Sequence, residues 1–223
     1  TLFQGRLDAS AAREPFERSV LSGSGEATVL ARYAQYSART GRDSEAVAAM
    51  TRALRLDPLN PLIYRAAGSV EYAARRYAES IPPLRKALDM NPKMGRAHAS
   101  IGDALLMLGK AAEARGEYAA EPAMDFNLAG IAIAGHRLGD TAAAGAALDR
   151  LRTQLGDKSL YQQAQVLAQM GNRESAITAL EQARAVGDGG LIYARNDPML
   201  DPLRSEPQFA RMLQGMGFDG GTA

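Results

Sequence analysis

The sequence contains no cysteine and no tryptophan, and it contains only two histidines. Without cysteine the chain can form neither a disulfide nor a thiolate metal site. The two histidines, His98 and His136, stand apart from any cluster of further ligands, so the pattern predicts no zinc site. We therefore expect no metal and no other cofactor.

An excess of charge of one sign is also lacking. The 26 basic and 25 acidic residues leave a formal net charge of +1, whereas a nucleic-acid-binding surface usually carries a marked basic excess. No apolar run approaches the roughly 20 residues that span a bilayer, and no signal peptide is visible. We expect no direct nucleic-acid binding and no membrane insertion by this stretch of chain. The excess of arginine over lysine is typical of a GC-rich bacterial genome, and the compartment, cytoplasm or periplasm, stays open.

Aromatic residues make up only 6% of the chain, although apolar residues reach 46%. Alanine supplies much of that apolar fraction. A core built on alanine buries little area per residue, so its elements must approach one another closely. A sheet would instead use β-branched and aromatic residues. The composition therefore favours stacked helices.

An internal repeat is the main signal in the sequence. Residues 53–58 read Ala-Leu-Arg-Leu-Asp-Pro, and residues 87–92 read Ala-Leu-Asp-Met-Asn-Pro. The prolines Pro58 and Pro92 are 34 positions apart, as are Ala53 and Ala87. A repeat of this length with these residues resembles the tetratricopeptide repeat, a helix–turn–helix unit.

The repeat pattern predicts how the helices pack. Small residues at fixed places let paired helices approach closely, and larger residues fill the gaps between neighbouring pairs. A single pair cannot bury its own apolar face, so neighbours stack into a superhelix with a concave side. We predict an all-α fold, an α-solenoid of tetratricopeptide-type helix hairpins over residues 6–190. Its predicted repeats cover about residues 27–60, 61–94, 95–124, 125–156 and 157–190, and the third is truncated by Glu121 and Pro122.

The two ends of the chain depart from the repeat. Residues 8–22 look like the second helix of a repeat whose first helix is absent, a half repeat. Residues 191–218 are predicted to form capping helices, two of which start at the Asp-Pro pairs 197–198 and 201–202. Residues 219–223 are predicted to form a disordered tail. Residues 1–5 read Thr-Leu-Phe-Gln-Gly, which resembles a viral 3C-type protease site. They are interpreted either as a tag remnant or as native sequence.

Two short stretches carry a second resemblance. Residues 196–204 read Asn-Asp-Pro-Met-Leu-Asp-Pro-Leu-Arg, and residues 161–165 read Tyr-Gln-Gln-Ala-Gln. They resemble the C-terminal tetratricopeptide modules of bacterial winged-helix transcription regulators, often membrane-anchored, and of some nucleotide cyclases. The resemblance implies the C-terminal part of a longer protein, in which this module senses a small effector or self-associates as a homodimer.

The tetratricopeptide family also implies a binding surface, because fixed positions of each first helix line its concave side. Carried over position by position, the candidate partner-binding residues are Arg32, Gln35, Arg39, Arg65, Ser69, Tyr72, Arg96, Asp103, His136 and Tyr161. Arginines beside Tyr72 could hold an acidic or carboxylate-bearing peptide through forked hydrogen bonds. The family's clamp for chaperone tails is largely missing, because Ala31 and Ala66 occupy two of its matching places.

No catalytic arrangement stands out in the sequence. There is no nucleophile with a neighbouring base, and the glycine-rich stretches at residues 22–25 and 187–190 lack the lysine of a phosphate-binding loop. We therefore expect no enzyme but a protein-interaction module that binds a peptide or a partner domain in its concave groove. The alternative is a sensory or regulatory module of a transcription regulator. An upstream winged helix followed by an apolar span would favour this alternative.

Overall fold

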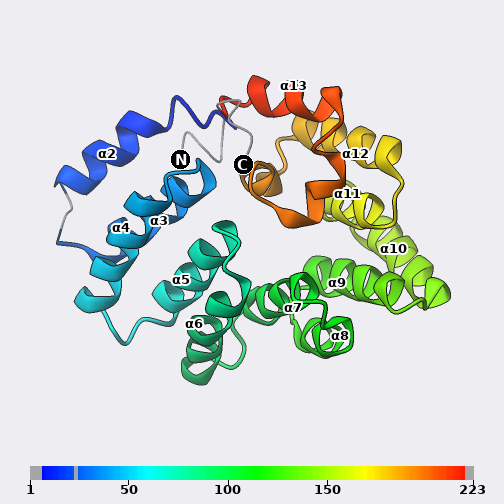
Figure 1. Ribbon diagram of the computed structural model, residues 1–223, viewed down its shortest axis with the longest axis horizontal. Helices are drawn as coiled ribbons and strands as arrows, with labels where there is room; N and C mark the ends of the chain where they lie inside the picture. Colours follow the sequence, from blue (N-terminus) through cyan, green and yellow to red (C-terminus); the bar gives the residue numbers. More distant parts are fainter. Residues whose placement is uncertain (1–6, 23–24, 219–223) are drawn as a thin grey trace.

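The computed structural model describes residues 7–22 and 25–218, and every regular element in these two ranges is a helix. The expectations for residues 1–5 and 219–223 fall outside the described residues. Helix pairs follow one another along the chain and stack into a curved array (Figure 1). The predicted all-α solenoid is therefore confirmed.

Each pair consists of an inner first helix and an outer second helix. The pairs are α3 (Ala27–Arg39) with α4 (Asp43–Leu56), α5 (Pro61–Ala73) with α6 (Tyr77–Met90), α7 (Ala97–Met107) with α8 (Ala111–Ala120), α9 (Met124–Arg137) with α10 (Thr141–Leu155), and α11 (Leu160–Gln169) with α12 (Arg173–Val186). The short 3₁₀ helix η1 (Gly156–Ser159) leads from α10 into α11. The second helix of the third pair, α8, ends directly before Glu121 and Pro122.

Buried small residues allow the helices of each pair to approach closely. Ala34, Ala46 and Ala53 are completely buried between α3 and its neighbours. Gly130 on α9 shows how tight the contact can be, because a Cβ atom at this position would overlap the ring of Tyr118 on α8. The Tyr118 ring therefore packs directly on the α9 backbone, which explains why a small residue is needed there.

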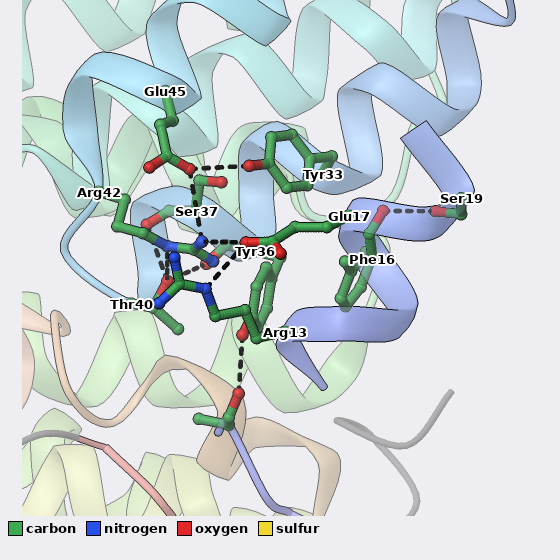
Figure 2. A network of polar contacts seen from close by, with 11 residues as sticks. Arg13, Phe16, Glu17, Ser19, Tyr33, Tyr36, Ser37, Thr40, Arg42 and Glu45 are labelled. Atoms are coloured by element: carbon green, nitrogen blue, oxygen red, sulfur yellow. Dashed lines mark hydrogen bonds and ion pairs between the residues drawn. The ribbon is translucent and has the colours of Figure 1, made fainter. Parts of the chain in front are cut away.

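The N-terminal helix α2 (Arg13–Ser22) begins later than residue 8, where the sequence placed it. Residues 9–12 form a turn that lies before the helix. Polar and aromatic contacts attach α2 to the first pair, as Figure 2 shows: Phe16 stacks on Tyr36 with ring centroids 4.4 Å apart, and Glu17 forms an ion pair with Arg42 at 3.5 Å. The Tyr36 hydroxyl donates to the Ala9 carbonyl at 2.7 Å, which fixes the turn as well.

The C-terminal region does more than cover the last repeat. It contains the 3₁₀ helices η2 (Gly189–Tyr193) and η3 (Pro198–Leu203) and the helix α13 (Pro207–Gly215). The last of these, α13, packs on α12, whereas η3 packs on the inner helix α11. The sequence placed a separate helix start at Asp201 and Pro202, but both residues lie inside η3. We call residues 188–204 the return segment, because they run back over the concave side towards the start of the chain.

The return segment and α13 close the curved array into a ring (Figure 1). The Asn196 side chain donates from Nδ2 to the Ala38 carbonyl of α3 at 2.6 Å. The backbone amide of Ala9 donates to the carbonyl of Met216 at 2.9 Å. The first and last parts of the described chain are therefore in direct contact, and the concave side of the solenoid becomes the interior of the ring.

Candidate functional site

The interior of the ring contains a pocket with a volume of about 390 Å³. All five inner helices line one side of it, and the return segment lines the other. Its polar lining includes Gln35, Arg39, Ser69, Tyr72, Arg96, Ser100, Asp103, Asp125, Lys158, Tyr161, Gln162, Gln165, Tyr193 and Asp197. The pocket is therefore a polar chamber built from side chains of distant parts of the chain.

The structure brings together most of the residues that the sequence proposed as a groove. Seven of them line the pocket: Gln35, Arg39, Ser69, Tyr72, Arg96, Asp103 and Tyr161. The other three lie outside its lining. Of these, Arg32 is exposed, whereas Arg65 and His136 are half-buried. The seven residues therefore line a pocket inside the ring. The sequence had predicted a concave groove.

Three arginines of successive repeats act on one another, and we call them the arginine cluster. Arg39 of α3 and Arg96, which precedes α7, form one wall of the pocket, and Arg65 of α5 lies near them outside its lining. Among the described residues, none of the three forms an ion pair with a carboxylate. Burial lowers the pKa of Arg39, and the charges of Arg96 and Arg65 lower it further. The cluster is therefore a concentration of positive charge that no carboxylate of the described residues neutralises through an ion pair.

Tyr193 of the return segment lies between two of these arginines. Its hydroxyl accepts a hydrogen bond from Arg39 and another from Arg96, each at 3.0 Å. Both guanidinium groups also lie over its ring, at 4.2 and 4.9 Å from the centroid. Burial alone would raise the pKa of Tyr193, but the charges of Arg39 and Arg96 lower it below the ordinary value.

A buried carboxylate positions Arg96. The backbone of Arg96 has a left-handed conformation (φ 70°) at the start of α7 and cannot cap the helix with its own side chain. The Glu121 carboxylate instead accepts from the backbone amides of Arg96 at 2.8 Å and Ala99 at 3.0 Å. Such a capping carboxylate satisfies amides at the helix start and interacts favourably with the helix dipole. The truncated third repeat therefore supplies Glu121 as a support for the arginine cluster.

A second wall of the pocket, also built on the inner helices, is acidic and aromatic. Asp103 of α7 accepts one hydrogen bond, from the Tyr118 hydroxyl at 2.7 Å. Burial raises the pKa of Asp103 to about 7, and the nearby Asp197 contributes to the increase. The hydroxyl of Tyr72 is buried and has no hydrogen-bond partner among the described residues. Burial raises the pKa of Tyr72, and the charge of Asp103, which lines the same pocket, raises it further.

Asp197 holds the return segment in place. Its carboxylate accepts from the Tyr161 hydroxyl and from Gln165 Nε2, both at 2.6 Å. It also caps η3 by accepting from the Met199 amide at 2.9 Å. Because these donors satisfy Asp197, we assign it a structural role, in contrast to Asp103.

Sequence reasoning missed the residues that the return segment contributes. The Asp-Pro pair at Asp197 correctly predicts a helix start, but nothing local indicates which surface that helix covers. Tyr193 contacts Arg39 across 154 positions of sequence. One signal was available in the sequence. The arginines of the cluster have no carboxylate partner in their own repeats, which could have indicated that a group from a distant part of the chain contacts them.

Comparisons with known proteins concern the repeats. Models described as tetratricopeptide repeat match residues 65–125 and residues 157–183. The chain therefore contains tetratricopeptide repeats in these two stretches.

Two solved structures have a similar fold. PilW, a widely conserved type IV pilus biogenesis factor, is 17% identical, with a TM-score of 0.56 over 85% of this chain and 92% of PilW. PilF of Pseudomonas aeruginosa is 18% identical, with a TM-score of 0.55 over 83% of this chain and 87% of PilF. At this identity the likeness concerns the fold. No curated protein matches the sequence.

Within residues 7–22 and 25–218, no group of three or more histidine, aspartate or glutamate side chains is arranged to hold a metal ion. Over the same residues, no helix combines the length and the apolar character that crossing a bilayer requires.

Proposed function

We propose that this scaffold binds a protein partner by taking a carboxylate-bearing side chain or chain end of that partner at the arginine cluster. The observation that carries the proposal is the convergence of Arg39, Arg65 and Arg96 without a carboxylate among the described residues. A partly buried charge without a counter-charge is unfavourable, and a carboxylate from a partner relieves that cost. Guanidinium groups suit this role because two parallel N–H donors match the two oxygens of a carboxylate.

The return segment determines how a partner can approach. Leu191, Ile192, Met199, Leu200 and Leu203 are each at most 2% exposed. Removing these five side chains from the core would cost on the order of 10 kcal/mol, at about 1.5–3 kcal/mol each. A peptide is therefore not expected to displace the segment and lie along the whole concave side. We propose instead that one end or one projecting side chain of the partner enters the pocket.

The proposal can be tested with peptides and one charge reversal. Fluorescence anisotropy would measure binding of an array of labelled decapeptides containing Asp or Glu, each with a matched Asn or Gln version and an amidated C-terminus version. We choose Arg65→Glu because Arg65 makes no hydrogen bond or ion pair within the described residues, whereas Arg39 and Arg96 hold Tyr193. We expect Arg65→Glu to weaken binding of acidic peptides at least about tenfold, or about 1.4 kcal/mol.

The matched control is Arg52→Glu, which reverses an exposed charge on the outer helix α4. It should leave the affinity unchanged, and thermal melting should show both variants folded. Added salt should weaken binding of the acidic peptides. Equal binding of the acidic and amide-containing peptides, or full affinity of a folded Arg65→Glu protein, would show that the arginine cluster is not the binding site.

A second candidate function is a sensory module that binds a small effector, as in the transcription regulators that the C-terminal motif resembles. The observation in its favour is the size of the pocket, because about 390 Å³ lies in the range of sites for small ligands. Neither PilW nor PilF is described as a transcription regulator. Binding of small carboxylates but of no peptide in the same assay would favour this second candidate.

A further inference from the structure

The acidic wall of the pocket contains a carboxyl group with spare hydrogen-bonding capacity. An aspartate carboxylate can accept about four hydrogen bonds. Asp103 accepts one within the described residues, from Tyr118, and forms no ion pair there. The neighbouring Asp197, by contrast, is satisfied by three donors. Asp103 is therefore the carboxyl group of this wall that is free to bind a ligand.

A second unsatisfied group lies beside it. The Tyr72 hydroxyl is buried, lines the pocket and makes no hydrogen bond to the described residues. A buried polar group without a partner costs about 1–3 kcal/mol, so such a group is rare in a folded protein unless something else satisfies it. Tyr72 comes from α5 and Asp103 from α7, so two helices present unsatisfied atoms to one space.

We propose that Asp103 and Tyr72 form a subsite for the cationic head of a ligand, a primary ammonium or a guanidinium group. Such a head donates hydrogen bonds to the free oxygen of Asp103 and to the hydroxyl oxygen of Tyr72. Ser69 and Ser100 line the same pocket one helical turn before Tyr72 and Asp103, and they supply further acceptor oxygens. Its charge neutralises the Asp103 carboxylate, which forms no ion pair with any of the described basic side chains.

A cation fits this wall better than an anion does. Asp103 and Asp197 bring two carboxyl groups to this wall, and burial strengthens the electrostatic interactions of their charged forms. The basic residue that acts on Asp103 is Arg96. The guanidinium of Arg96 is held by Tyr193 and stacks on Phe126 at 4.5 Å. The subsite stands on these contacts and does not depend on the arginine cluster binding a carboxylate.

The cation has two sources, a free amine or the lysine side chain of a peptide, and two probes distinguish them. Titration of ¹⁵N-labelled protein with n-butylamine tests the free amine, and titration with N-acetyl-lysine amide tests the side chain. In both titrations n-pentanol serves as an uncharged probe of similar shape. We expect saturable shifts of amide signals around Asp103 and Tyr72 with at least one cationic probe. Saturation by one probe alone identifies the source.

Two variants test the assigned groups. Asp103→Asn keeps an acceptor for Tyr118 but removes the charge, so affinity should fall at least about tenfold. Tyr72→Phe removes only the hydroxyl and should weaken binding severalfold, which provides a second measurement if Asp103→Asn alters the fold. The control Asp149→Asn lies on the exposed face of α10 and should bind as the parent does.

The dependence on pH gives an independent readout. Four groups shift the pKa of Asp103. They are Tyr118 of α8, Asp197 at the N-cap of η3, Arg96 at the N-cap of α7 and Glu121 after α8. Because the pKa of Asp103 is about 7, the charged fraction rises about tenfold between pH 6 and pH 8. The affinity for a cation should rise by a similar factor. Equal binding of n-pentanol, unchanged affinity of a folded Asp103→Asn protein, or no saturable shift with either cation would overturn the subsite.

Discussion

At the scale of single residues, the interior of the ring separates two kinds of charge. The positive wall contains arginines that form no ion pair with a described carboxylate, and the acidic wall contains Asp103, which forms no ion pair with a described basic residue. Burial disfavours the charged form of the Arg39 and Asp103 side chains, at a cost in free energy. It therefore lowers the pKa of Arg39 and raises the pKa of Asp103. Neither cost is needed to hold the repeats together, because apolar contacts do that. This is why we place function at these two walls.

The raised pKa of Asp103 has a consequence for stability. In the unfolded chain Asp103 has an ordinary pKa near 3.8, whereas in the folded chain the value is about 7. The folded state therefore binds the proton more tightly. The contribution of Asp103 to stability is complete below pH 4 and is lost as the pH rises to 7.

Replacing Asp103 by Asn should remove this dependence. Urea unfolding would measure the free energy of unfolding of the parent and of Asp103→Asn at pH 4 and at pH 7.5. The change between the two pH values should differ between the two proteins. The parent should lose up to about 4 kcal/mol more than the variant over this range, from about 1.4 kcal/mol per pKa unit. The control Asp149→Asn should follow the parent. Parallel curves for the parent and Asp103→Asn would contradict the raised pKa.

At the scale of elements, the 34-residue period predicts the helix pairs well. The small and large residues recur at fixed positions within each repeat, so short stretches of sequence are enough to locate each helix. The positions of α3 to α12 follow from small residues such as Ala34 and Ala46 and from the matching positions of the other repeats. The same register placed seven of ten candidate residues at one pocket, because a position within a repeat determines which side of its helix faces inward. The start of α2 and the second helix start at Asp201 were misplaced, since neither lies in a repeat.

The contact between α8 and α9 offers a test of this packing. A Cβ atom on Gly130 would overlap the Tyr118 ring, whereas a Cβ atom on Gly145 of α10 would have no atom within 4 Å. Gly130→Ala should therefore destabilise the protein by about 1–3 kcal/mol. Gly145→Ala should stabilise it by about 0.5–1 kcal/mol, because alanine is the better helix former. Thermal or urea unfolding measures both, and equal effects would argue against the tight contact.

At the scale of the whole molecule, the sequence could not predict the closure of the ring. The return segment contacts residues more than 100 positions away, such as Arg75, whose guanidinium binds Asp201 with two hydrogen bonds of 2.7 Å. Contacts of this range leave no periodic pattern in the sequence. The apolar core reflects the closure, because Ala9 and Ala12 belong to the same buried cluster as Met216 and Phe218.

Closure should make the first helix pair depend on the return segment. Tyr193→Ala removes the side chain that joins Arg39 to Arg96, and it should cost about 3 kcal/mol, by analogy with other buried aromatic residues. Hydrogen exchange should then report a larger loss of protection in α3 and α4 than in α9 and α10. Uniform loss in both regions, or unchanged protection in α3, would show that the return segment does not stabilise the first pair.

The contact between Ala9 and Met216 also limits how this protein can change in length. An open array of repeats tolerates duplication of one unit, because each unit touches only its immediate neighbours. Here an inserted pair would move the two ends apart and leave Tyr193 out of reach of Arg39. The geometry of the ring therefore sets the number of repeats that it can hold.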